Sequence, residues 1–180
     1  MNQGSSPIID RASPELPTRF GFLLIDDFSL ISMSSAIETL RMANRLMGKE
    51  FYRWKTISET GEAVCASDGL SVNPDCGIDH PDVFQGLDAI VVCGGRRVDR
   101  RVTDPILRWL KKAASTGLQL GSTCTGSYVL AKAGLLDGLT ATTHWGALDR
   151  LGRLGAMPTG DRVVEHLDRR IITAAGVSSG

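Results

Sequence analysis

The stretch that most constrains the fold of this 180-residue chain is residues 119–134, QLGSTCTGSYVLAKAG. A short apolar run leads through small residues to Cys124, and a helical pattern then opens at Thr125 and ends at Gly134. This order predicts a strand, a sharp turn and a helix, with the thiol at a helix N-terminus, where backbone N–H groups favour a thiolate or a bound anion. Taken alone, the pattern leaves open whether Cys124 is a pocket residue or a small buried side chain.

The order of strand followed by helix recurs along the chain. Residues 19–25 form a continuous apolar run, and a helical pattern follows over residues 32–48. Residues 89–93 form a second buried run, and residues 104–117 form a helix after it. Such alternation predicts an α/β fold, a flavodoxin-like three-layer sandwich with a mostly parallel sheet and helices on both faces.

Shorter elements complete the expected sheet. Asp104 is expected to be the N-cap of its helix, with Pro105 as the first helical residue. In the first helix, the apolar residues from Met33 to Met47 recur at helical spacing and are expected to face the sheet. The remaining predicted elements are a strand over 52–58, a hairpin or irregular excursion over 63–78 and a helical turn over 82–84. They are followed by a strand over 140–143, a helix over 147–154 and a closing strand pair over 163–167 and 171–175.

Composition excludes several classes of protein. Twenty basic residues balance twenty acidic ones, so the chain lacks the cationic surplus that a free-standing nucleic-acid-binding domain uses on phosphates. No run of 18 apolar residues is present, so no membrane span is expected. The cysteines show neither a C-x-x-C pair nor a zinc-like spacing, which predicts reduced thiols, a cytoplasmic protein, no metal and no cofactor. They are Cys65, Cys76, Cys93 and Cys124.

The chain is expected to hold one folded domain. Residues 1–18 are rich in Pro, Ser and Gly and lack the features of a signal peptide, so they are predicted to be a flexible leader. Residues 19–180 are long enough to bury one sizeable core. Residues 176–180 resemble an N-cap region with no helix behind it, which suggests a domain excised from a longer protein.

Polar and aromatic residues follow four of the predicted strands. Because α/β proteins bind ligands beyond the carboxyl ends of their strands, these groups are expected to converge on one pocket. The groups are residues 26–29 after the first strand, Gly94 to Arg97 after the second buried run, Cys124 to Gly126 at the turn, and His144 with Trp145 after residues 140–143.

Two kinds of chemistry suit such a pocket. Cysteine catalysis needs a thiolate, a base and oxyanion donors, for which His144 and the backbone N–H groups of Thr125, Gly94 and Gly95 are candidates, but no acidic residue is placed to support them. Alternatively, an aromatic wall holds an alkylated amine by cation–π attraction. Phe28 and Trp145 are the candidate residues for this wall, although both could instead be packed in the core. Glu38 could reach the elbow or lie on a polar helix face. The arginines from Arg96 to Arg101 could bind an anion or form a solvated loop or subunit contact.

Five segments, taken in order, resemble a known family. They are RFGFLLIDDFSLISMSSAIETLRMANRL, VVCGG, GSTCTGSYVLAKAGLLDG, TATTHW and ITAAGVSSG. Over residues 19–180 they resemble the class I glutamine amidotransferase-like (PfpI/ThiJ) domain that forms the N-terminal half of GlxA-type transcription regulators of the AraC family. In such regulators a C-terminal pair of helix-turn-helix motifs binds DNA, so the resemblance implies DNA contact only through a domain absent from this chain, and a homodimer is expected.

The resemblance also bears on the role of Cys124. In PfpI-type proteases a histidine follows the elbow cysteine, whereas Thr125 stands there in this chain. ThiJ-type relatives carry a glutamate early in the first helix that hydrogen-bonds the cysteine, and Ser32 occupies that position. Cys124 and His144 match family positions while these partners are missing, which favours ligand binding over hydrolysis.

The leading hypothesis is therefore an effector-sensing domain of a transcription regulator. Regulators of this group respond to small nitrogen metabolites such as arginine, carnitine or glycine betaine, so the resemblance implies an amino-acid-like or quaternary-ammonium effector. The alternatives are a cysteine-dependent hydrolase or glyoxalase-like enzyme using Cys124 and His144, and a thiol-based oxidative sensor using Cys124. The residues expected to bind the effector are Phe28, Ser29, Ser32, Glu38, Gly94, Gly95, Arg96, Cys124, Thr125, His144 and Trp145.

Overall fold

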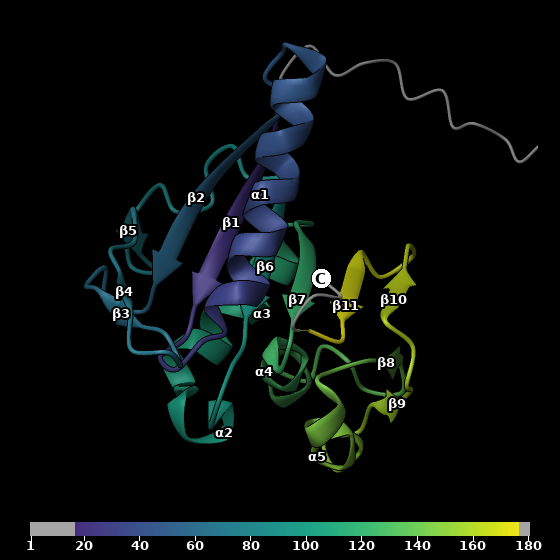
Figure 1. Ribbon diagram of the computed structural model, residues 1–180. Helices are drawn as coiled ribbons and strands as arrows, with labels where there is room; N and C mark the ends of the chain where they lie inside the picture. The colour runs from purple at the N-terminus through teal and green to yellow at the C-terminus, as the bar shows by residue number, and fades with distance from the viewer. Residues whose placement is uncertain (1–16, 177–180) are drawn as a thin grey trace, which may run out of the picture.

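A seven-stranded sheet forms the centre of the computed structural model, which describes residues 17–176 (Figure 1). In chain order its strands are β1 (Thr18–Leu24), β2 (Tyr52–Ser58), β5 (Cys76–Gly77), β6 (Ala89–Cys93), β7 (Gln119–Thr123), β10 (Val163–His166) and β11 (Ile171–Ala174). Their order across the sheet is β10-β11-β7-β6-β1-β2-β5. All neighbours are parallel except β10 and β11, which form the predicted closing pair in antiparallel orientation.

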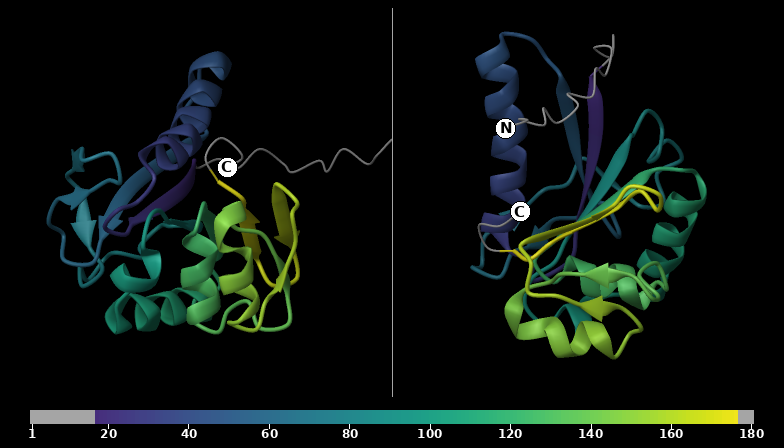
Figure 2. Two further views of the ribbon diagram at one scale, coloured as in Figure 1. Left: turned by 60° about the horizontal axis from the view of Figure 1, so that its bottom comes forward. Right: turned by 90° about the vertical axis from the view of Figure 1, so that its right-hand side faces the viewer.

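Helices lie on both faces of this sheet (Figure 2). They are α1 (Leu30–Met47), α2 (Val98–Arg101), α3 (Asp104–Ser115), α4 (Gly126–Lys132) and α5 (Leu148–Gly152), with a 3₁₀ turn, η1 (Trp145–Ala147). Successive residues of a strand point to opposite faces, so Phe22 and Leu24 of β1 pack in the hydrophobic cluster beneath α1, whereas Leu23 packs in the cluster that contains residues of α3 and α4. The predicted three-layer α/β fold is confirmed.

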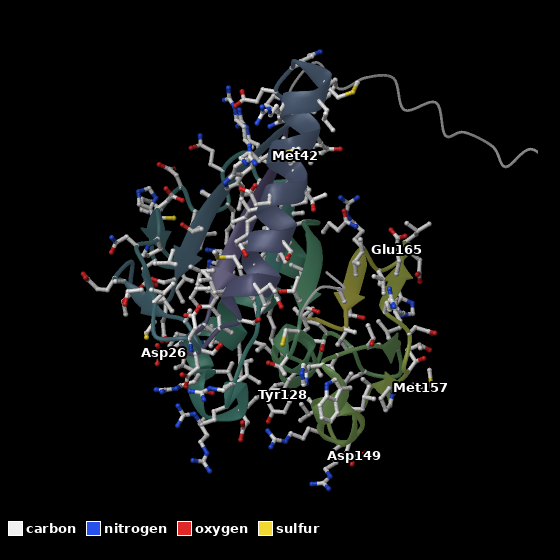
Figure 3. The ribbon with its side chains drawn as sticks, viewed as in Figure 1. Asp26, Met42, Tyr128, Asp149, Met157 and Glu165 are labelled. Carbon is white, nitrogen blue, oxygen red and sulfur yellow. The ribbon has the colours of Figure 1, made fainter. Side chains whose placement is uncertain are left out.

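Two small sheets lie outside the central one. The predicted hairpin within residues 63–78 is present as β3 (Val64–Cys65) and β4 (Ser71–Val72). The strand predicted over residues 140–143 is only β8 (Thr140–Ala141). It pairs with β9 (Met157–Pro158), which the sequence did not reveal and of which Met157 is labelled in Figure 3. Beyond β8, side-chain hydrogen bonds add to those of the backbone: the Thr142 hydroxyl donates to the Asp161 carbonyl at 2.6 Å.

The helix ends follow the sequence with small differences. α1 ends at Gly48, whose φ of +60° is the left-handed conformation that glycine adopts readily. Met47 is exposed, contrary to its predicted inward position, because the last turn of α1 runs past the end of the sheet (Figure 1). α3 is capped by Thr103, whose hydroxyl oxygen accepts from the Ile106 N–H, so Asp104 is the first helical residue rather than the cap.

The chain ends are covered only in part. Residues 1–16 of the predicted leader and residues 177–180 lie outside the described residues. Thr18, placed in the leader by the sequence, is the first residue of β1, and its N–H donates to the Phe51 carbonyl at 2.8 Å. Within residues 17–176, no helix combines the length and the hydropathy that a bilayer crossing requires.

Candidate functional site

The predicted strand, turn and helix around Cys124 are present. β7 ends at Thr123, Cys124 follows with a φ of +56°, and α4 begins at Gly126. A positive φ is uncommon for a residue with a side chain and persists only where the surroundings fix it. Here the surroundings are backbone: a Cβ on Gly94 would overlap the amide nitrogen of Gly126, and a Cβ on Gly126 would overlap the carbonyl oxygen of Val92.

Cys124 is covered by neighbouring segments and is only 5% exposed. Its carbonyl oxygen accepts hydrogen bonds from the His144 backbone N–H at 3.3 Å and from the Thr143 hydroxyl at 3.1 Å. Gly176, just after β11, passes so close that a Cβ there would overlap the Cα of Cys124. The elbow therefore lies beneath the segments that follow β8 and β11.

The loop between β1 and α1 is hydrogen-bonded through Ser29 to Gly94, the residue that packs against the elbow. The Ser29 N–H donates to the Gly94 carbonyl at 2.9 Å, and the hydroxyl of the buried Ser32 donates to the Ser29 hydroxyl oxygen at 3.0 Å. From the elbow itself, the Thr125 hydroxyl donates to the Gly95 carbonyl at 2.7 Å. The structure thus brings together Ser29, Ser32, Gly94, Gly95, Cys124 and Thr125 from the predicted set.

One of the predicted anion donors is already used. The Gly94 N–H donates to the Thr123 carbonyl at 3.2 Å, where it continues the bonding between β6 and β7. Gly94 therefore holds the elbow in place instead of offering a donor to a ligand. The backbone N–H groups of Thr125 and Gly95 remain the predicted donors.

Two predicted residues lie away from any ligand-accessible wall. Phe28 is 0% exposed and packs with Met33 and Cys93 beneath α1, so it cannot form the predicted aromatic wall with Trp145. Glu38 lies on the exposed side of α1, where its carboxylate accepts from Arg41 one helical turn later. A carboxylate paired there does not reach the elbow.

Arginines in the segment from Arg96 to Arg101 contact Asp27, in the loop after β1. Their segment includes α2 and is not the simple loop that was expected. Arg97 and Arg101 donate to Oδ2 of Asp27 at 2.9 and 3.1 Å, and the exposed Arg96 lies 3.9 Å from Oδ1. Burial opposes ionisation of Asp27, but hydrogen bonding from Arg101 and the charges of Arg97 and Arg101 outweigh it, so the pKa of Asp27 lies below its ordinary value.

Asp27 is a residue that sequence reasoning missed. The signal was an acidic pair after one buried strand and an arginine cluster after another, but only pairing of β1 with β6 brings the two together. Asp99, the acid within the cluster itself, pairs instead with Arg150 at 3.2 Å.

Replacing Asp27 by asparagine is expected to destabilise the domain by about 1 kcal/mol at neutral pH, since the arginine partners are partly exposed. The folded-state pKa lies below 3.8, so the stabilisation is present above that value and is lost as the pH falls through the folded-state pKa. Urea unfolding of both proteins at about pH 7 and about pH 3 measures the difference, which should shrink in acid. The exposed Asp168→Asn serves as control, and an equal Asp27→Asn effect at both pH values would contradict the assignment.

His144 and Trp145 stand beside the elbow. The His144 Nδ1 accepts from the Gly146 N–H at 3.2 Å and caps η1, and the His144 ring lies 5.2 Å from that of Trp145. Trp145 is 80% exposed, so its indole face is available to a ligand.

A cavity of about 140 Å³ lies next to these two residues. It is smaller than most ligand pockets and suits a compact molecule. Its wall combines hydroxyls, one exposed aromatic ring and backbone, and the sequence identified only the histidine and tryptophan in it. The lining residues are Thr142, Thr143, His144, Trp145, Leu148, Thr159, Gly160, Ala175 and Gly176.

The thiols differ in their surroundings. Burial raises the pKa of Cys93 to about 12. Cys65 is exposed, and no disulfide joins the four cysteines, all of which lie in the described part. Within residues 17–176, no three His, Cys, Asp or Glu side chains are grouped as metal ligands.

Comparison with known proteins adds to this geometry. Residues 19–180 match the DJ-1/PfpI family. The chain is 43% identical over 160 residues to the HTH-type transcriptional regulator GbdR of Pseudomonas aeruginosa, covering 89% of this chain and 43% of that protein. It is also 40% identical over 118 residues to the isonitrile hydratase of Pseudomonas putida, covering 65% of this chain and 50% of the enzyme.

The fold has a similar solved structure, the crystal structure of an AraC family transcriptional regulator from Pseudomonas putida. The TM-score is 0.77 at 27% identity, covering 89% of this chain and 84% of that one. The present chain spans less than half the length of GbdR.

Proposed function

Because this chain belongs to the DJ-1/PfpI family, we propose that it is the small-molecule effector-sensing domain of an AraC-type transcription regulator and not an enzyme. One observation carries the proposal. Thr125 and Ser32 stand where the family resemblance places a histidine and a glutamate of enzymatic relatives, and both hydroxyls bind neighbouring loops. Neither side chain can serve as a base or an acid for Cys124, which supports ligand binding beside the elbow over catalysis.

Similarity to transcription regulators supports this function. The identity to GbdR extends over most of this chain, and the AraC-type regulator structure matches the fold. In the proposal, a separate helix-turn-helix domain contacts DNA, which agrees with the zero net charge of these 180 residues. The regulator would act in the cytoplasm as a homodimer.

The proposed effector site is the cavity beside the elbow. Since no acidic side chain lines it, the exposed face of Trp145 is the group that favours a cation. The backbone N–H groups of Thr125 and Gly95 do not line this cavity, so they would receive a carboxylate only from a ligand that extends from the cavity to the elbow. This pairing suits an amino-acid-like or quaternary-ammonium metabolite, and binding would act by favouring one of two conformations of the domain.

Calorimetric titration with glycine betaine, carnitine and arginine tests the proposal. At least one is expected to bind, and Trp145→Ala should weaken its binding about tenfold, because a cation–π contact is lost. Leu46→Ala is the matched control, since this large apolar side chain is equally exposed but lies on α1. Failure of all three compounds to bind the folded chain, or unchanged affinity in Trp145→Ala, would contradict the proposed site.

The second candidate function is cysteine-dependent catalysis, and the strained φ of Cys124 favours it. Sequence similarity to the isonitrile hydratase gives this candidate further support. In this alternative, Cys124 is the nucleophile and His144 its base.

Alkylation by iodoacetamide at about pH 6 separates the two functions, because only a thiol with a lowered pKa reacts rapidly there. We expect Cys124 to react no faster than the exposed Cys65, which acts as an internal standard, and Cys93 to be inert because its pKa is about 12. Peptide mass spectrometry over a time course measures each rate. Modification of Cys124 at least tenfold faster than Cys65 would favour the enzyme instead.

A further inference from the structure

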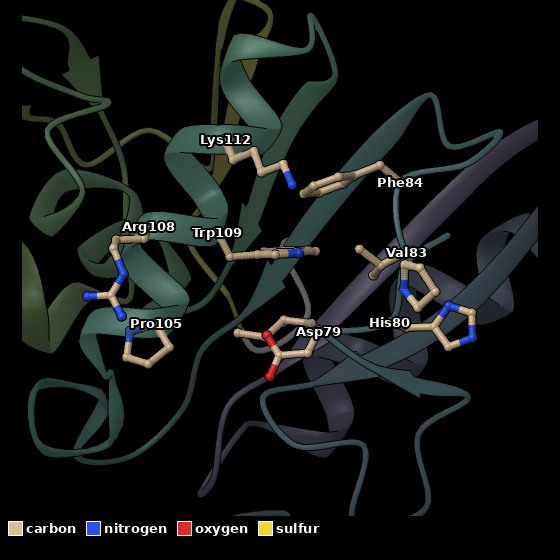
Figure 4. A pocket seen from close by; sticks show the side chains of 10 residues that line it. Asp79, His80, Val83, Phe84, Pro105, Arg108, Trp109 and Lys112 are labelled. Carbon is tan, nitrogen blue, oxygen red and sulfur yellow. The ribbon is translucent and has the colours of Figure 1, made fainter.

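A second and larger cavity lies away from the elbow. Its volume is about 360 Å³, and it opens between α3 and residues 78–84, the segment that leads from β5 towards β6 (Figure 4). This volume lies within the range of pockets that hold small molecules. None of the residues that line the cavity beside His144 contributes to it.

One wall of this cavity is rigid and aromatic. The ring of Phe84 stacks on that of Trp109, with centroids 5.1 Å apart and planes 22° apart. Trp109 is only 6% exposed, and its indole Nε1–H has no hydrogen-bond acceptor among residues 17–176. A buried donor without an acceptor is uncommon and costly, which shows that the protein's own packing leaves this wall incompletely satisfied.

Charged side chains of both signs line the same cavity. Arg108 and Lys112 lie one turn apart on α3, and Lys112 Nζ stands 5.7 Å from the centroid of the Phe84 ring. Asp79 comes from the opposite segment, and Figure 4 shows it on the same side of the Trp109 ring as Arg108. None of these three side chains forms an ion pair with another residue in the part of the chain that the structure describes.

We infer that this cavity is a second binding site, for a small zwitterion that carries a carboxylate, an amine and an apolar body. Arg108 receives the carboxylate, since a guanidinium binds a carboxylate through two parallel hydrogen bonds. Asp79 receives the ammonium group. The body packs against Pro105 and the Trp109 wall, whereas Lys112 lies beside Phe84 on the other side of the Trp109 ring.

The charge pattern selects a zwitterion over simpler ligands. A plain organic acid would leave Asp79 facing an uncompensated anion, and a plain amine would leave Arg108 without an anion. Both mismatches cost binding free energy, whereas a molecule with both groups satisfies each wall. The site shares no residue with the proposed effector site, so either can fail while the other stands.

Titration of the 180-residue chain with L-phenylalanine tests the inference, with 3-phenylpropionate and 2-phenylethylamine as probes that lack the amine or the carboxylate. The readout is the set of indole N–H signals of Trp54, Trp109 and Trp145 in a ¹H–¹⁵N spectrum, assigned by Trp→Phe variants. We expect saturable shifts of the Trp109 signal, with phenylalanine binding at least about tenfold tighter than either partial probe.

Exposed residues allow matched variants that should fold normally. Arg108→Gln and Asp79→Asn are each expected to weaken phenylalanine binding by about tenfold or more, while Lys111→Gln, next to the site on α3, leaves it unchanged. The inference is overturned if phenylalanine at about 10 mM leaves the Trp109 signal unmoved. Equal binding of a partial probe, or shifts confined to Trp145, would overturn it as well.

Discussion

Replacing Gly94 by alanine is expected to remove about 3 kcal/mol or more of folding stability, a large share of what a domain of this size possesses. The new Cβ would overlap the amide nitrogen of Gly126 and the carbonyl carbon of Thr125. These are backbone atoms at the start of α4, so no side chain can rotate to make room. The loss is measured as a shift of the urea midpoint or as failure to accumulate folded protein.

A matched glycine distinguishes this effect from a general one. Gly160→Ala is the control, because a Cβ there meets nothing within 4 Å. Its stability should stay within about 0.5 kcal/mol of the parent chain. Gly94→Ala with an unchanged midpoint would mean that β6 and the elbow are not packed backbone to backbone.

Replacing Phe28 by alanine is expected to cost about 3 to 5 kcal/mol, because the side chain is 0% exposed and the cavity left behind cannot collapse fully. Phe28→Leu retains most of the volume and should cost about 1 kcal/mol. Urea unfolding with the effector titration in parallel measures both effects. Trp145→Ala, at an exposed position, should leave stability within about 0.5 kcal/mol.

This pair of tryptophan and phenylalanine variants separates a binding role from a packing role. If Phe28→Ala kept its stability and lost only effector binding, the predicted aromatic wall would be correct and the packing assignment wrong. We expect the reverse, with Phe28 acting on stability and Trp145 on binding.

Most of the fold could be predicted from the local periodicity of apolar residues. The order of strands and helices, the sharp turn at Cys124 and the stop at Gly48 each depend on a few consecutive residues, and such signals survive in one sequence. The predicted N-cap was wrong by one residue because Thr103 and Asp104 are both good caps.

Pairings between distant loops could not be predicted in the same way. Phe28 follows a strand and looks like a loop residue, yet bridges to Ala66 and Gly95 fix it between two other segments and turn its ring into the core. Asp27 meets Arg97 and Arg101 only because β1 and β6 are neighbours in the sheet. The sequence leaves Glu38 either at the elbow or on a polar helix face, and only its pairing with Arg41, one turn away on the same helix, places it on the polar face.

The cavity beside α3 could not be predicted from the sequence either. Trp109 belongs to the apolar face of a predicted helix and gave no sign of lining a hollow. Its neighbours Asp79 and Phe84 come from a segment with little regular structure, whose path depends on the whole sheet. Sites built from such segments require coordinates.

The contact between Gly176 and Cys124 fixes the chain at the end of β11 against the elbow. Because there is no room for even a methyl group between them, the elbow cannot shift towards the end of β11 without pushing that segment along. A ligand in the cavity lined by Thr143 and Gly176 would therefore touch the segment after β11, which in turn lies against Cys124.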